Sequence, residues 1–119
     1  MTNAAPQRPH RTGLRLAELD PARGKHVSTP WGSFALYLVD GEVLCAQAFC
    51  PHMDGPLFEG TLTQGANGEA SIVCPWHLWR YDVRTGKRVD LAGLMDRRCL
   101  TRLAATIDHD GTILLAPCT

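Results

Sequence analysis

Residues 74–82 read CPWHLWRYD, and this stretch contains two side chains that bind soft metals, Cys74 and His77. A cysteine by itself is more often a small buried hydrophobe than a ligand. A histidine by itself is more often satisfied by hydrogen bonds than by a metal. The stretch therefore indicates a metal site only if another part of the chain supplies matching ligands.

A matching half lies upstream, in CPHMDGPLFEG at residues 50–60. Cys50 and His52 form a Cys-x-His pair, whereas Cys74 and His77 form a Cys-x-x-His pair. Each cysteine follows a strand-like segment and precedes a proline, which stiffens the loop by fixing φ. Two such loops facing each other would hold one small metal centre. Two thiolates and two imidazoles suit a single tetrahedral zinc ion. They equally suit a [2Fe–2S] cluster in which two histidines replace cysteines on one iron, so the ligand types leave both open.

The composition is that of one ordinary globular domain. The chain has 119 residues, of which 45% are hydrophobic and 20% charged. Twelve basic and twelve acidic residues cancel, so we expect no nucleic-acid partner. No run approaches the roughly 18 apolar residues of a membrane helix, and the start, MTNAAPQRPHRTG, lacks the apolar core of a secretion signal. We therefore expect a cytoplasmic protein without a membrane partner, and the odd number of cysteines, five, argues against a disulfide framework.

The order of segments predicts an all-β fold. We expect a disordered tail over residues 1–13 and one domain over residues 14–119. Asp40-Gly41 joins two strand-like runs, which predicts a two-residue hairpin because both turn positions need positive φ. The strand-like runs of this hairpin are SFALYLV (33–39) and EVLCAQAF (42–49). A second hairpin is expected from ATID (105–108) and TILLA (112–116), which flank residues 109–111. This pattern favours an antiparallel sandwich or small barrel, with the ligand-bearing middle region as an inserted subdomain.

The two loops closely resemble the cluster-binding loops of Rieske-type ferredoxins, through CPH…GPL…G and CPWHxWRYDxRTGK. The resemblance implies one [2Fe–2S] cluster per chain. Cys50 and Cys74 would hold the inner iron, and His52 and His77 the outer, more exposed iron, which would be the electron exit and the docking centre. The implied function is a one-electron carrier, not an enzyme, that takes electrons from a reductase and passes them to an acceptor oxygenase or similar redox enzyme.

Other functions compete with this one. The small subunit of an assimilatory nitrite reductase has the same pattern, and the sequence does not separate the two. A structural zinc module of the Cys2His2 type fits the four ligands but leaves the wider loop match unexplained. An oxygenase catalytic subunit needs a second iron site, and His109 is the sole histidine after residue 90, so we expect no such site and no small-molecule substrate.

The resemblance also assigns roles to neighbouring residues. Gly55 would let backbone N–H groups approach the cluster, and Met53 and Leu57 would cap its exposed edge. Trp76 and Trp79 are first interpreted as core aromatics, with screening of the cluster from water as the alternative.

This chain departs from some relatives. Those of cytochrome bc complexes brace the cluster with a disulfide, whose places here hold Asp54 or its neighbours and Trp76. Trp79 replaces a serine that donates to cluster sulfur, whereas Tyr81 keeps the place of a tyrosine that does the same. Leu78 stands where the family usually has glycine.

Three further expectations concern segments outside the two loops. The excess length between the loops, residues 63–69, predicts an extended hairpin tip. Residues 91–95 would stand in for the third, proline-containing loop of relatives. Cys45, Cys99 and Cys118 receive no role, and Cys45 is expected to be buried.

Overall fold

The computed structural model describes residues 9–20, 22–51, 54–64, 70–76, 78–89 and 99–117. The described residues contain strands, two short 3-10 turns and no α-helix, as the sequence predicted. The strands are β1 (His10–Arg15), β2 (Lys25–Thr29), β3 (Gly32–Val39), β4 (Glu42–Gln47), β5 (Leu62–Gln64), β6 (Ala70–Val73), β7 (Arg80–Asp82), β8 (Arg102–Ile107) and β9 (Thr112–Pro117), and the 3-10 turns are η1 (Leu16–Glu18) and η2 (Leu57–Glu59). No helix in the described part of the chain has the length and apolar character that a membrane crossing requires.

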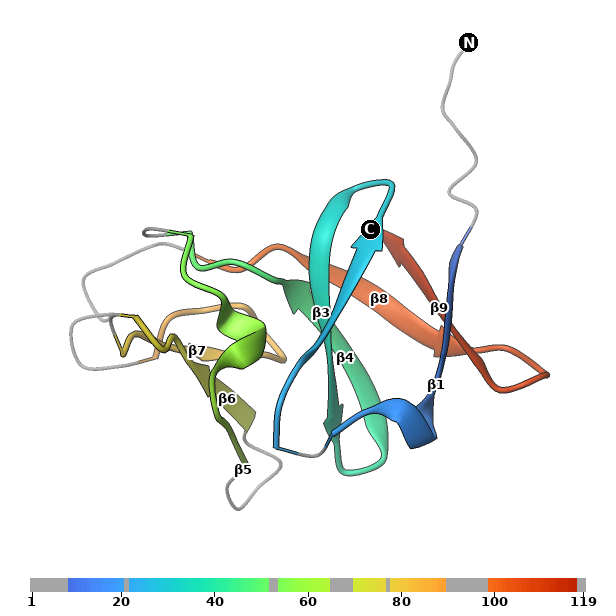
Figure 1. Ribbon diagram of the computed structural model, residues 1–119, viewed down its shortest axis with the longest axis horizontal. Coiled ribbons are helices and arrows are strands. Elements are labelled where there is room, and N and C mark those ends of the chain that lie inside the picture. The colour runs from blue at the N-terminus through green and yellow to red at the C-terminus, as the bar shows by residue number, and fades with distance from the viewer. Residues whose placement is uncertain are drawn as a thin grey trace, which may run out of the picture.

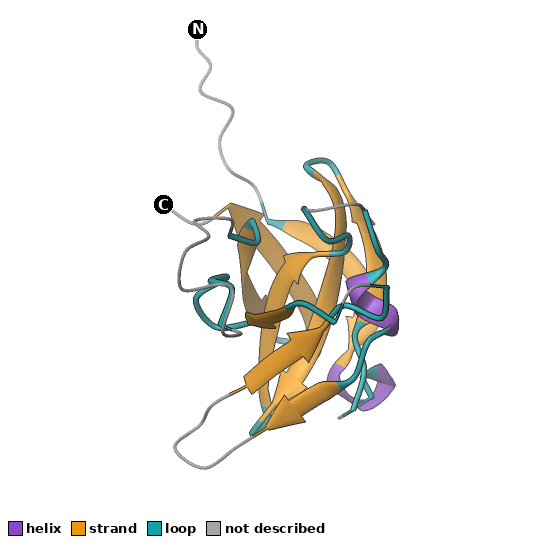
Figure 2. Ribbon diagram, turned by 90° about the vertical axis from the view of Figure 1, so that its left-hand side faces the viewer, coloured by secondary structure: helices purple, strands orange, loops and turns teal. Residues whose placement is uncertain are grey.

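Six of the strands form one antiparallel sheet in the order β1-β9-β8-β4-β3-β2. The sheet curls so that its two edge strands approach each other, which gives a nearly closed barrel (Figures 1 and 2). At this seam the ring of His10 on β1 meets Trp31, in the turn after β2, edge-on with 6.5 Å between ring centroids. The small-barrel prediction is therefore confirmed.

Both predicted hairpins are present in this sheet. Asp40 and Gly41 have φ values of 51° and 77°, the pair of left-handed residues that a tight two-residue turn requires. Val39 and Glu42 face each other directly across that turn. The second hairpin joins β8 to β9, and Ile107 pairs with Ile113 across its turn.

The middle of the chain is an insertion into the barrel. β4 pairs directly with β8, through Cys45 opposite Leu103 and Ala46 opposite Arg102. The chain between these strands leaves the barrel and forms a separate antiparallel sheet in the order β5-β6-β7 (Figure 1). The predicted inserted subdomain is thus confirmed, and its hairpin β5–β6 stands where the extra length was expected. The tip itself, residues 65–69, lies outside the described residues.

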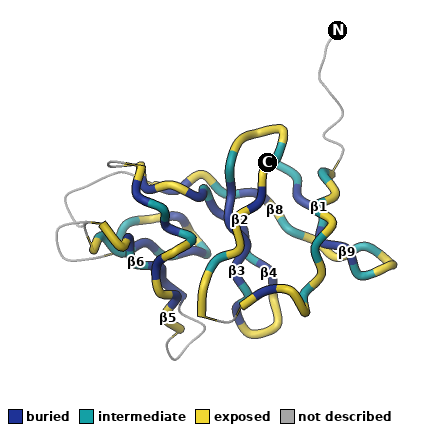
Figure 3. Tube along the Cα trace, in the orientation of Figure 1, coloured by how far each residue is buried: buried dark blue, intermediate teal, exposed yellow. Residues whose placement is uncertain are grey.

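The barrel wall has a core on each side of β3. Successive side chains of a strand point to opposite faces. Accordingly, Leu36 packs in the interior of the barrel with Ile113 and Leu115. Tyr37 and Val39 face the insertion instead. This second cluster, here called the insertion core, comprises Ala35, Tyr37, Val39, Ala46, Cys50, Leu57, Leu62, Ala70, Ile72, Cys74, Tyr81, Val83 and Leu100. Figure 3 shows the buried residues concentrated along β3, β4 and β6.

Two elements differ from expectation. β1 begins at His10, four positions before the predicted domain start at Leu14, and residues 1–8 lie outside the described residues. β2, with the sequence KHVST, was not predicted. Only Val27 of its five residues is buried, so it shows little apolar alternation, and its strand conformation comes from pairing with β3.

Candidate metal centre

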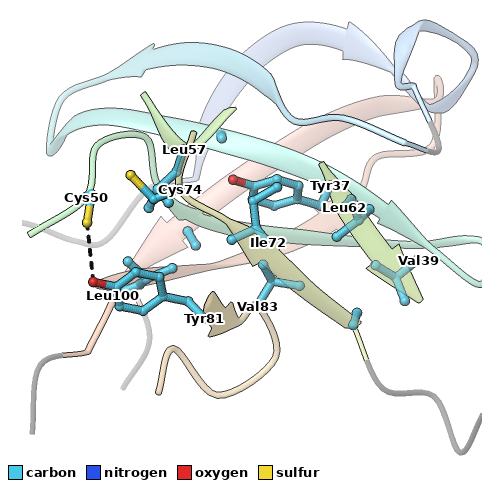
Figure 4. Packing of buried hydrophobic residues seen from close by; sticks show 13 residues of the cluster. Tyr37, Val39, Cys50, Leu57, Leu62, Ile72, Cys74, Tyr81, Val83 and Leu100 are labelled. Carbon is cyan, nitrogen blue, oxygen red and sulfur yellow. Dashed lines mark hydrogen bonds between the residues drawn. The ribbon is translucent and has the colours of Figure 1, made fainter. Parts of the chain in front are cut away.

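The two predicted cysteine ligands lie at one end of the insertion core. Cys50 follows β4 and Cys74 follows β6, and both are fully buried free thiols. The two loops are in contact at Gly55. A Cβ atom built on this residue would lie 2.7 Å from Cys74 Sγ and 3.3 Å from Cγ of Trp76. Backbone of the first loop therefore lies directly against sulfur of the second. Figure 4 shows both sulfurs beyond the apolar side chains of the core.

The two loops close with the same pair of backbone hydrogen bonds. In the first loop, Cys50 N–H donates to Gly55 O at 2.7 Å, and Asp54 N–H donates to Cys50 O at 2.8 Å. In the second, Cys74 N–H donates to Trp79 O and Leu78 N–H donates to Cys74 O, both at 2.8 Å. The loops are structural repeats of each other, although their ligand spacings differ.

Each loop also places a left-handed residue at the same position. Asp54 has φ 58° and Leu78 has φ 61°, in the region where non-glycine residues are uncommon and leucine is unfavourable. A glycine adopts this conformation freely, whereas Leu78 adds an exposed side chain to the same left-handed backbone. Sequence reasoning missed the left-handed backbone of Asp54. The signal for it was the alignment of the two Cys-Pro openings, which puts Asp54 opposite Leu78.

Tyr81 lies where the sequence predicted a hydrogen-bond partner for a cysteine. Its hydroxyl is 3.3 Å from Cys50 Sγ, and both residues are fully buried (Figure 4). Tyr81 belongs to β7 and faces Ile72 of β6, so the small sheet fixes the direction of its ring. When the cysteine is a metal-bound thiolate, the hydroxyl is the donor of this hydrogen bond.

The aromatic neighbours of the second loop have different environments. Trp79 is half-buried against the insertion core, and the guanidinium carbon of Arg88 lies 3.3 Å from the centroid of its ring. Trp76 is 60% exposed and Leu78 is 71% exposed. The interpretation of Trp76 as a core aromatic is therefore wrong. Leu57 is fully buried beneath the loops and does not cap an exposed edge.

Several predicted residues fall outside the described part of the chain. His52, Met53 and His77 lie outside the described residues, as do Cys118 and the stand-in third loop at residues 91–95. Among the remaining cysteines, Cys45 is buried in the barrel, as expected, and Cys99 is exposed.

The described residues fit a metal centre held by thiolates. Two buried thiols in one core cluster have the chemistry of soft-metal ligands, and the Tyr81 hydroxyl lies 3.3 Å from one of them. Gly55 keeps space beside Cys74 Sγ that any side chain would fill. This donor set suits zinc as well as an iron–sulfur cluster.

Comparison with protein families separates these possibilities. Residues 14–99 match the family model described as the Rieske [2Fe-2S] domain. A relative from Pseudomonas putida, the ferredoxin component of the p-cumate 2,3-dioxygenase system, is 36% identical over 70 residues, which are 56% of each chain. Apoptosis-inducing factor 3 from mouse is 30% identical over 83 residues, which are 70% of this chain but 13% of that protein. The chain thus spans only a small part of some relatives that it matches.

Solved structures show the same fold over nearly the whole chain. The ferredoxin of carbazole 1,9a-dioxygenase from Nocardioides aromaticivorans superimposes with a TM-score of 0.77 at 24% identity, covering 92% of this chain and 98% of that one. A ferredoxin in complex with the oxygenase of carbazole 1,9a-dioxygenase gives 0.75 at 22% identity, covering 92% and 94%. A candidate NADH-dependent nitrite reductase small subunit from Mycobacterium tuberculosis gives 0.73 at 19% identity, covering 93% and 94%.

Proposed function

Because the chain belongs to the Rieske [2Fe-2S] domain family, we propose that it binds one [2Fe–2S] cluster and carries single electrons in the cytoplasm from a reductase to an acceptor enzyme. The observation that carries the proposal is the pair of equivalent loops that bury Cys50 and Cys74 in the insertion core, with Gly55 of the first loop against Cys74 Sγ of the second. When bound, the cluster accepts one electron and releases it again. The protein thus needs no substrate pocket and no general base.

Each ligand has a place in this proposal. Cys50 and Cys74, which are buried, hold the inner iron. His52 and His77 hold the outer iron, since each belongs to the same loop as one of the cysteines. Imidazole is neutral where thiolate is anionic, so this ligand set raises the reduction potential above that of all-cysteine ferredoxins.

The tip of the second loop supports docking of a redox partner at this end of the molecule. Leu78 exposes an apolar side chain and has an unfavourable left-handed backbone, so it benefits neither core packing nor local conformation. Trp76, two positions earlier, is exposed as well. Exposed aromatic and aliphatic side chains beside a ligand suit the centre of a small interface, where such residues contribute most of the binding energy.

We favour an oxygenase of a multicomponent aromatic-ring dioxygenase system as the acceptor. The P. putida relative is the ferredoxin component of one such system, and the carbazole structure is a complex of ferredoxin with oxygenase. The second candidate is a small subunit of nitrite reductase, which the likeness to the M. tuberculosis protein supports.

The first experiment is a metal analysis with absorption and EPR spectra of the purified protein, oxidised and then reduced with dithionite. We expect two irons and two sulfides per chain, a red-brown colour and a reduced EPR signal with an average g value near 1.9, typical of histidine-ligated [2Fe–2S] centres. A colourless, EPR-silent protein with one zinc per chain would contradict electron transfer and leave a binding module.

The second experiment distinguishes the acceptors. With NADH and the reductase of an aromatic-ring dioxygenase system, the reduced protein should transfer its electron to the oxygenase component in rapid-mixing absorption measurements. Transfer to a nitrite reductase large subunit, with none to the oxygenase, would select the second candidate.

A further inference from the structure

We propose that Arg88 raises the reduction potential of the cluster by holding a fixed positive charge over Trp79, on the face of the small sheet that contacts the cysteine loops. This inference rests on the proposed function, since it needs the cluster. Arg88 lies outside both ligand loops, so a residue beyond the loops would contribute to the reduction potential.

The position of Arg88 follows from a hairpin that continues β7. Asp82 N–H donates to Lys87 O and Val89 N–H donates to Arg80 O, both at 2.8 Å. Between these two bonds, Tyr81 and Arg88 form an antiparallel bridge. Directly opposed residues of an antiparallel pair put their side chains on the same face, so Arg88 shares the face of Tyr81.

That face contacts both cysteine loops. Trp79 directly precedes β7, and Arg88, which shares the face of Tyr81, contacts the Trp79 ring. The Tyr81 hydroxyl lies 3.3 Å from Cys50 Sγ. The backbone carbonyl of Trp79 accepts the Cys74 N–H at 2.8 Å, and its indole packs against the insertion core, which contains both cysteines.

The stack on Trp79 holds the charge in place. The guanidinium carbon of Arg88 lies 3.3 Å from the Trp79 ring centroid, a cation–π contact that a planar guanidinium makes well. Both side chains are half-buried, so the charge is partly removed from water. Arginine remains charged at every physiological pH, and a partly buried charge is screened less by salt than an exposed one.

The sign of the effect follows from electrostatics. Reduction adds one negative charge to the site, and a nearby cation favours the more negative state. Arg88 therefore stabilises the reduced form relative to the oxidised form, which raises the midpoint potential. Trp79 acts as a positioning residue, because it fixes the guanidinium on the face that contacts the cysteines.

The test is spectroelectrochemical titration of the loaded protein with Arg88→Gln, and Arg84→Gln as the matched control. Each variant removes one positive charge from the same hairpin. Arg84, however, pairs at 2.8 Å with Glu42, the first residue of β4, whereas Cys50 follows the other end of that strand. Its charge is remote from the cysteines and is screened at physiological salt over about 8 Å.

We expect a lower midpoint for Arg88→Gln than for wild type, and a shift clearly larger than that of Arg84→Gln. Arg88→Lys keeps the charge and should keep most of the potential. In a Trp79→Leu background the effect of Arg88→Gln should shrink, because the platform is gone. If Arg88→Gln does not retain the cluster, the midpoint of Arg88→Met is measured in its place. Methionine keeps an apolar contact with the indole.

A merely structural role makes a different prediction. Loss of the stack would lower the free energy of unfolding of the neutral variants while leaving the midpoint at the wild-type value, and that result overturns the inference. Failure of the proposed function is distinguishable, because wild-type protein would then contain no [2Fe–2S] cluster to titrate.

Discussion

Tyr81 and Cys50 join the small sheet to the barrel end of the first loop, with the tyrosine hydroxyl 3.3 Å from the cysteine sulfur and both side chains fully buried. A hydrogen bond donated to sulfur becomes stronger as the sulfur gains negative charge. The phenol therefore favours reduction of a cluster bound by that sulfur.

Tyr81→Phe should lower the midpoint potential. If the bond is stronger by about 1 kcal/mol in the reduced state, the shift is roughly 40 mV, since 59 mV corresponds to a tenfold change for one electron. Spectroelectrochemical titration measures it. Tyr37→Phe is the matched control, because Tyr37 is equally buried in the insertion core but its hydroxyl has no hydrogen-bond partner among the described residues. Its potential should equal that of wild type, and an unchanged midpoint in Tyr81→Phe would mean that the bond has no redox effect.

Gly55→Ala should impair cluster binding. The added Cβ would lie 2.7 Å from Cys74 Sγ, so the loops must separate or the sulfur must move. Iron content per chain after purification measures the loss. The neighbouring variant Asp54→Gly is the control, because glycine accepts the φ of 58° at that position without strain, and it should keep its iron. Full iron content in Gly55→Ala would show that the contact is dispensable.

Leu78→Gly should weaken binding to the oxygenase while leaving the fold intact. Glycine relieves the left-handed strain, about 1 kcal/mol, and no buried contact is lost because the side chain is 71% exposed. The midpoint reduction potential should stay close to wild type and the urea unfolding midpoint should not fall, whereas the apparent Kd for the oxygenase should rise several-fold. An unchanged Kd would remove Leu78 from the docking surface.

The turn between β8 and β9 should make the stability of the protein sensitive to acid. Hydrogen bonds from the backbone and hydroxyl of Thr112 lower the pKa of Asp110 to about 2, with help from Arg11. Arg11 first, then His109, lowers the pKa of Asp108. A lowered carboxyl pKa in the folded state stabilises the protein above the unfolded pKa, about 3.9, and the contribution disappears as pH falls towards 2.

Comparison of wild type with Asp110→Asn tests this, because both share the acid lability of the metal site. In urea unfolding, wild type should have the larger free energy of unfolding at pH 6. The difference from Asp110→Asn should narrow between about pH 4 and 2. A gap that is constant over this range would show that Asp110 stabilises the turn without its charge.

Particular residues show what the sequence could predict. Asp40-Gly41 indicated the first hairpin because two consecutive left-handed positions leave little choice of residue. Cys50 and Cys74 were recognised by their repeated Cys-Pro context, and Tyr81 by its offset from the second loop. In each case a few neighbouring residues were enough to make the prediction.

The remainder depends on contacts between distant segments. The left-handed conformations of Asp54 and Leu78 accompany loop closure, and the leucine type gives no sign of it. The stack of Arg88 on Trp79 arises only once the segments on either side of the turn at residues 82–86 pair. The exposure of Trp76 could not be inferred either, because tryptophan occurs both in cores and at exposed loop tips.

The pairing of β4 with β8 bears on how the chain reaches its native state. Cys45 and Leu103 are adjacent in the barrel yet far apart along the chain, and bringing such ends together carries an entropic cost that local hairpins avoid. High contact order of this kind slows folding. The two local hairpins, β3–β4 and β8–β9, can form early, whereas the β4–β8 pairing between them has to close the loop formed by the intervening segment. Because the metal-binding region lies between β4 and β8, its length adds to the entropic cost of closing the barrel that supports it.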